Sequence, residues 1–112
     1  MDKPYDLSGI RAITGDNVEF LEKVIVLFIS SVADDMQLLK DKSGEDNWSE
    51  VAALAHKIRS PLSQFGINTL VVEKLENQDG FSIRQLHLFV DELDSELRKV
   101  INHLKEEFPG ND

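Results

Sequence analysis

The segment spanning residues 51–66 contains a histidine, His56, which is followed closely by Lys57 and Arg59. The segment has no acidic residue, although the whole chain carries a net charge of −9. An unprotonated imidazole nitrogen is a good nucleophile near neutral pH, and arginine and lysine supply positive charge beside it. This pattern is typical of a nucleophile presented to a partner.

A helix through this segment, turning by about 100° per residue, collects its apolar residues on one arc. The residues of that arc are Val51, Leu54, Ala55, Ile58, Leu62 and Phe65. His56 points the opposite way, and small side chains surround it at Ala52, Ala53, Ser60 and Ser63. We therefore expect an exposed imidazole, with these four small residues leaving room for a docking partner.

Two helices are expected before this segment. Asp6 is placed to cap a short helix over residues 7–13, which Gly15 would end. Asp16 followed by Glu19 has the form of a capping box and opens a long helix that ends near Gly44. The apolar stripe of the long helix consists of Leu21, Val24, Ile25, Phe28, Val32, Met36 and Leu39.

The helix with His56 opens at a second capping box, Asn47 with Glu50, and closes around Gly66. A shorter helix is predicted over residues 69–77, and Asp79 and Gly80 predict a turn. A last helix is capped by Ser82 and Gln85 and ends before Pro109. Its apolar residues are Leu86, Val90, Leu93, Leu97, Val100 and Leu104. These elements predict an all-α fold, an antiparallel four-helix bundle with a short extra N-terminal helix.

The composition suits one domain over residues 1–112 and sets limits on its partners. The chain has 12 basic and 21 acidic residues, too few positive charges for the basic stripe that nucleic acid needs. It has no cysteine, and its most apolar stretch, residues 24–29, is far shorter than the roughly 20 residues of a membrane span. We expect a cytoplasmic, monomeric domain without membrane contact, with a protein as its partner.

The run His56-Lys57-Ile58-Arg59-Ser60, continuing to Phe65-Gly66, resembles the signature of histidine-containing phosphotransfer (HPt) domains of two-component phosphorelays. In that signature an aliphatic residue, a basic residue, a small residue and a glycine follow the histidine at these offsets. The resemblance extends over most of the chain, because the family folds as a four-helix bundle with a short N-terminal helix.

The resemblance implies that His56 accepts a phosphoryl group from the aspartate of a response-regulator receiver domain and passes it to another receiver. Arg59 would take the place of the family's basic residue and contact phosphate oxygens, while Lys57 adds a less directed charge. Mg²⁺ is expected in the partner receiver domain, with no cofactor and no metal in this chain. Such a phosphocarrier has no kinase activity of its own, and it occurs alone or as a domain of a membrane-bound hybrid sensor kinase.

Two other interpretations stay open. His56 to Leu62 also resembles the histidine box of sensor kinase dimerisation domains, in which proline and leucine follow at these offsets. Against it, that box usually has an acid directly after the histidine, where this chain has Lys57. The third interpretation is an acidic helical scaffold that never carries phosphate. Pro61 lacks the amide that would bond to the Lys57 carbonyl, so we expect the helix to bend there.

Other polar residues are weaker candidates. Gln64 and Gln78 are expected to be surface amides that stay apart from the imidazole. The pairs His87 with Asp91 and His103 with Glu107 have the i, i+4 spacing of metal ligands, but surface pairing on a helix explains them better. We expect Trp48 at the edge of the core.

Overall fold

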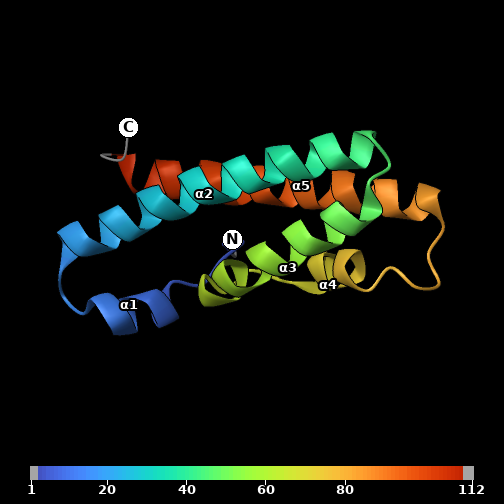
Figure 1. Ribbon diagram of the computed structural model, residues 1–112. Helices are drawn as coiled ribbons and strands as arrows, with labels where there is room; N and C mark the ends of the chain where they lie inside the picture. The colour runs from blue at the N-terminus through green and yellow to red at the C-terminus, as the bar shows by residue number, and fades with distance from the viewer. Residues whose placement is uncertain (1–2, 110–112) are drawn as a thin grey trace.

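The computed structural model describes residues 3–109, which form five helices (Figure 1). Helix α1 spans Ser8–Thr14, α2 spans Val18–Gly44 and α3 spans Trp48–Gln64. Helix α4 spans Leu70–Glu76 and α5 spans Ile83–Glu107. The described residues contain no strand, so the predicted all-α class is confirmed.

Helices α2 to α5 form a closed bundle in which each helix packs against the next. Helix α3 lies between α2 and α4, and α5 closes the ring by packing against both α4 and α2 (Figure 1). Neighbouring helices run antiparallel, because residues further along one helix contact residues nearer the start of its neighbour. Lys40 of α2 pairs with Asp94 of α5, while Ser43, further along α2, contacts His87, nearer the start of α5. The predicted bundle is therefore present, with α1 added beside α2.

The core is built by the predicted stripes. All six residues of the α3 arc and all six of the α5 stripe are buried, as is the α2 stripe except for the half-buried Val24. The rings of Phe28 and Phe65 stack with their centroids 3.8 Å apart and hold the end of α3 against α2. Because the α5 stripe is covered within one chain, it serves as bundle core.

The helix starts follow the capping predictions only in part: Asn47 caps α3 through its side chain, but its own amide donates to the carbonyl of Lys42 and not to Glu50 as the predicted box requires. The capping box of Ser82 and Gln85 is present, with both hydrogen bonds made. Asp16 was expected to cap α2, but that prediction is wrong: Asn17 is the N-cap, and its side chain accepts from the amide of Phe20 at 2.9 Å. Two adjacent residues of capping type compete here, and the helix begins one residue later than expected.

Helix α1 is also displaced by one residue from its predicted range of 7–13. Its N-cap is Leu7, which makes no side-chain cap, while the Asp6 carboxylate accepts from the amide of Ser8 at 2.9 Å. Hydrogen bonds from Ser8 lower the pKa of Asp6. Gly15 follows the helix with a φ of 59°, as expected of a residue that ends it.

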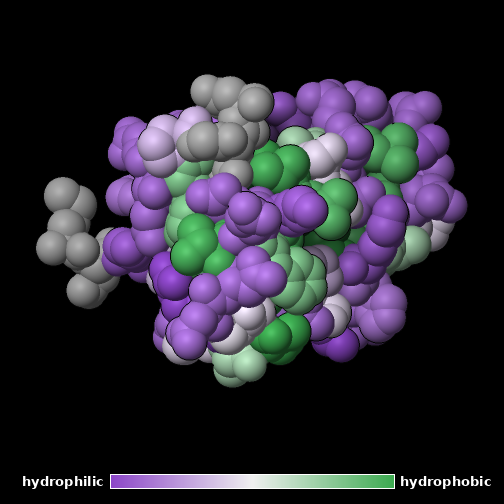
Figure 2. Space-filling model, turned by 90° about the vertical axis from the view of Figure 1, so that its left-hand side faces the viewer, coloured by the Kyte–Doolittle hydropathy of each residue, from purple (hydrophilic) through white to green (hydrophobic). Residues whose placement is uncertain are grey.

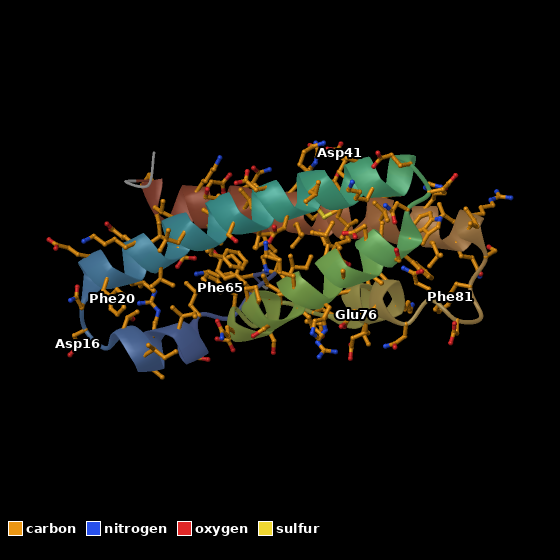
Figure 3. The ribbon with its side chains drawn as sticks, in the orientation of Figure 1. Asp16, Phe20, Asp41, Phe65, Glu76 and Phe81 are labelled. Carbon is orange, nitrogen blue, oxygen red and sulfur yellow. The ribbon has the colours of Figure 1, made fainter. Side chains whose placement is uncertain are left out.

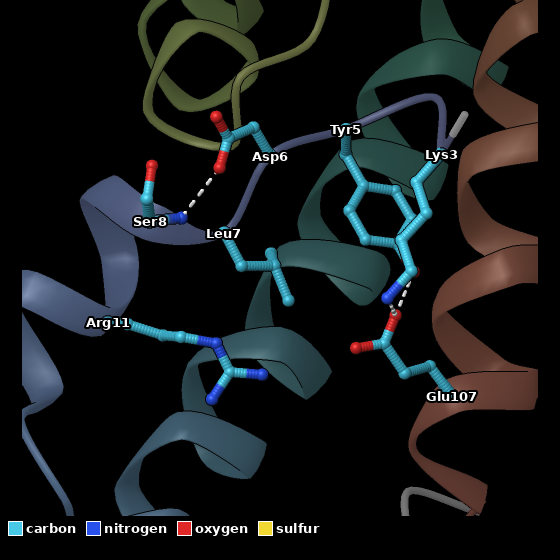
Figure 4. A pocket seen from close by; sticks show the side chains of 7 residues that line it. All are labelled: Lys3, Tyr5, Asp6, Leu7, Ser8, Arg11 and Glu107. Atoms are coloured by element: carbon cyan, nitrogen blue, oxygen red, sulfur yellow. Dashed lines mark hydrogen bonds and ion pairs between the residues drawn. The ribbon is translucent and has the colours of Figure 1, made fainter.

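The segment before α1 is fastened to the end of α5 (Figure 4). Lys3 and the Tyr5 hydroxyl both donate to Oε1 of Glu107, at 2.7 and 2.6 Å. Burial alone would raise the pKa of Glu107, but these hydrogen bonds lower it overall. Burial and the Glu107 carboxylate raise the pKa of Tyr5.

The same segment also holds the end of the histidine helix. The amide of Asp6 donates to the carbonyl of Phe65 at 2.9 Å. Next to it Gly66 has a φ of 65°, and a Cβ there would lie 2.6 to 2.8 Å from atoms of Asp6. Glycine is required at this position both for the backbone conformation and for the close approach of Asp6.

Large apolar side chains stay exposed where α1 meets α2, at Ile13, Val18 and Phe20. Figure 2 views the molecule from this end and shows apolar patches among polar groups. Phe20 lies well away from Glu76 in Figure 3, so these patches are remote from the histidine site described below. Within residues 3–109, no helix combines the length and apolar character needed to cross a membrane.

Candidate functional site

Helix α3 presents His56 on the surface, as its sequence predicts. Asn47 caps the helix by accepting from the amide of Glu50, and Trp48 at its start packs half-buried against the core. The side chain of His56 is 72% exposed, while Ala55 and Ile58 beside it are fully buried. The burial of one arc therefore fixes the outward direction of the imidazole.

The imidazole is held by a carboxylate from another helix. Oε1 of Glu76, at the end of α4, lies 2.5 Å from Nδ1 of His56. The Glu76 side chain is only 10% exposed, and it extends to the histidine from α4, which packs against α3. Sequence reasoning missed this residue.

The contact with Glu76 fixes the imidazole tautomer. An ionised carboxylate can only accept, so Nδ1 of His56 carries the proton and donates it to Glu76. The lone pair of the neutral ring is then on Nε2, the nitrogen without a protein partner among the described residues. The site therefore offers one defined nucleophilic atom to solvent.

Arg59 joins the same carboxylate. Its Nη1 donates to Oε2 of Glu76 at 3.0 Å, so the two oxygens of Glu76 bind two residues that lie one turn apart on α3. The Arg59 side chain is 44% exposed, and its remaining donors stay available. Glu76 thus holds a cation beside the imidazole.

Lys57 takes a different direction from the other two residues. Its Nζ donates to Oδ1 of Asp35 on α2, at 2.9 Å. Its charge is therefore paired on the α2 side of α3, whereas Arg59 and His56 are paired on the α4 side. The less directed charge that was expected beside His56 is paired with this carboxylate.

The four small residues lie where the helical arc predicted. Ala53, Ser60 and Ser63 are exposed and Ala52 is half-buried. All four belong to the face of α3 that carries His56, so apart from Arg59 the neighbours of His56 on this face are small. Their role in docking stays a prediction.

The two glutamines stay apart from the imidazole. Gln78 donates its amide to the carbonyls of Trp48 and Leu75, at 2.8 and 2.9 Å, so it ties the start of α3 to α4. Gln64 is exposed at the end of α3. Gln78 is thus a half-buried link between two helices, whereas a surface amide was expected.

The other two histidines contact residues of other segments of the chain. Nδ1 of His87 lies 3.2 Å from Oγ of Ser43, and Nε2 lies 3.2 Å from Oδ1 of Asp46. The ring of His103 packs edge-on against Tyr5. Across residues 3–109, no three residues among His, Cys, Asp and Glu are grouped to hold a metal ion.

Pro61 lies inside α3 without ending it. The helix continues from Pro61 to Gln64, and the carbonyl of Pro61 accepts from the amide of Phe65 at 3.1 Å. The proline falls in the last turn, so only a few residues follow the missing hydrogen bond. The expected bend at Pro61 stays a prediction.

Comparison of the chain with protein-family models, with curated proteins and with solved structures gives no match.

Proposed function

We propose that this chain is a phosphocarrier of the histidine phosphotransfer type. His56 accepts a phosphoryl group from the aspartate of a response-regulator receiver domain and passes it to another receiver. The observation that carries the proposal is the exposed imidazole whose Nδ1 is held by Glu76, with Arg59 on the same carboxylate.

The chemistry follows from the tautomer. The lone pair of Nε2 attacks phosphorus and forms a P–N bond, while the P–O bond to the aspartate breaks and the aspartate leaves as a carboxylate. The ring, which keeps the proton on Nδ1, gains positive charge in this step. Glu76 faces that proton and stabilises the developing charge, because its oxygen is already in place before the reaction.

Arg59 acts on the phosphoryl group, whereas Glu76 acts on the imidazole. Phosphoryl transfer depends mainly on positioning and on stabilising charge on the phosphoryl oxygens. Arg59 stands one turn from His56, and its guanidinium keeps donors free after bonding Glu76. Mg²⁺ in the receiver's acidic pocket would supply the remaining positive charge from the partner.

The bundle also favours a carrier over the sensor kinase interpretation. A kinase dimerisation domain uses a two-helix hairpin that pairs with a second chain. Here α3 already packs between α2 and α4 of one chain, and α5 closes the ring. Lys57 also stands where the kinase box usually has an acid.

The proposal is tested by labelling the histidine directly. Phosphoramidate and a receiver domain phosphorylated with acetyl phosphate are each mixed with the chain, and acid-labile, base-stable label is measured. We expect label in the parent, in His87→Gln and in His103→Gln, and none in His56→Gln. Label that survives His56→Gln, or a parent that neither donor labels, contradicts the proposal. Labelling by ATP and Mg²⁺ alone would instead support the kinase interpretation.

A further inference from the structure

Asp35 is the one buried charged residue within residues 3–109. It lies on α2 and is 9% exposed, and its Oδ1 accepts from Nζ of Lys57 at 2.9 Å. The Lys57 side chain is 64% exposed, so the pair joins a buried carboxylate to a cation at the surface. Lys57 directly follows His56, which brings this pair to the border of the proposed phosphoryl site.

The pair fixes the direction of a flexible side chain. Lysine carries its charge on a four-carbon stem that can take many directions. Moving Lys57 away would leave the Asp35 carboxylate desolvated without a counter-ion, which is strongly unfavourable. The ammonium is therefore held on the α2 side of α3 and away from the exposed face that carries His56.

Stability alone does not account for the pair. A buried or half-buried ion pair is on average no more stabilising than well-packed apolar residues of similar volume. The contact between α2 and α3 already has the stacked rings of Phe28 and Phe65 and a shared apolar core. What Asp35 adds, and an apolar residue would not, is the placement of the Lys57 charge.

We infer that Asp35 is a positioning residue that withholds Lys57 from the phosphoryl group on His56. This inference rests on the proposed function. Because Asp35 keeps the Lys57 ammonium away from the phosphoryl group, Arg59 is the cation of this segment that contacts the phosphoryl oxygens. Less positive charge near Nε2 stabilises the phosphorylated state less, and this favours a carrier that must give the group away again.

The test uses Asp35→Asn and phosphoramidate, a small anionic donor that needs no docking surface. Its P–N bond breaks as the bond from Nε2 to phosphorus forms, and ammonia leaves. Release of Lys57 should speed the labelling of His56 about fivefold at low salt, as expected for one added charge within about 4 Å in water. The half-life of the phosphohistidine should lengthen by a similar factor, and both effects should shrink in high salt.

Matched variants separate this effect from a general change of charge. Asp34→Asn removes an exposed acid from the neighbouring position of α2 and should leave both rates within about twofold, because solvent and salt screen exposed charges. Asp35→Asn combined with Lys57→Met should return the rates to the parental values. Asp35→Leu tests the same release without a polar acceptor, and thermal unfolding checks that each variant is folded.

The outcomes distinguish the two proposals. If His56 is labelled in the parent but Asp35→Asn and Asp35→Leu change neither rate, the inference about Asp35 is wrong and the proposed function stands. The inference is also wrong if Asp34→Asn has the same effect, or if the gain survives the Lys57→Met change. If no variant is labelled at His56, the proposed function itself fails.

Discussion

Glu76 places Oε1 2.5 Å from Nδ1 of His56, although the two residues are 20 positions apart and lie on different helices. The contact sets the tautomer of the imidazole and leaves the lone pair of the neutral ring on Nε2. The short helix α4 therefore supplies the carboxylate that orients the imidazole of α3.

Replacing Glu76 by alanine should lower the rate of phosphoryl transfer to His56 by about tenfold or more, since a hydrogen bond to a charged group is worth about 1.5 to 3 kcal/mol. Glu76→Gln keeps an acceptor without the charge and should recover part of the rate. Single-turnover labelling measures both. Glu73→Ala is the matched control, because Glu73 is an exposed acid one turn earlier on α4. Equal rates for Glu76→Ala and Glu73→Ala would remove Glu76 from the mechanism.

Arg59→Ala should slow transfer or shorten the life of the phosphohistidine, with the fold intact. The side chain is 44% exposed, and exposed substitutions usually change stability by about 0.5 kcal/mol or less. Arg59→Lys should restore some activity, because it keeps the charge but loses the planar fork. Transfer kinetics and thermal unfolding are measured together. Unchanged kinetics would make Arg59 a partner of Glu76 only.

Bulk on the exposed face of α3 should block a protein donor but not a small one. Ser60→Phe and Ala53→Trp both change exposed positions and should prevent transfer from a phosphorylated receiver domain. Phosphoramidate should still label His56 in the same variants, and their helicity and thermal stability should stay near the parental values. Transfer from the receiver at the parental rate would place the docking surface elsewhere.

Two glutamates of α5 should give opposite pH dependences of stability. Hydrogen bonds from Lys3 and Tyr5 outweigh the effect of burial and lower the pKa of Glu107. Its contribution is present above the pKa of the unfolded chain and is lost as pH falls through the lowered value. Glu107→Gln should therefore be less stable than the parent near pH 7, and the difference should close in acid.

Glu96 should give the opposite pH dependence of stability, because its pKa is raised and not lowered. Burial, and then repulsion from Glu92, raises the pKa of Glu96. Its favourable contribution is present below the unfolded pKa and is lost as pH rises through the raised value. Glu96→Gln should therefore be more stable than the parent near pH 7. Urea unfolding between pH 3 and pH 7 compares both variants, and parallel curves for the two would contradict these assignments.

The sequence could predict each helix and the direction of His56, because those depend on spacing within one segment. The α3 arc from Val51 to Phe65 is buried as its periodicity requires, and the exposed imidazole follows from it. Glu76 could not be found in this way. It meets His56 only because α4 packs against α3, and nothing in its local sequence distinguishes it from Glu73.

The same limit applies to charge and to the exact helix starts. The sequence shows that Lys57 is positive, but only the packing of α2 against α3 brings Asp35 within 2.9 Å of its ammonium. Asp16 and Asn17 are both good capping residues, so capping preference alone does not choose between them. Local signals leave such alternatives nearly equal in energy.

Lys3 and Glu107 are joined by an ion pair 2.7 Å long, so the two ends of the described chain lie side by side. This arrangement suits circular permutation, because a short linker can connect such ends without disturbing the bundle. New termini can be opened at the exposed turn of Asp79 and Gly80, which follows α4. The permuted protein would keep His56 and Glu76 on one continuous segment, so its histidine site should assemble even though its helices follow one another in a new order.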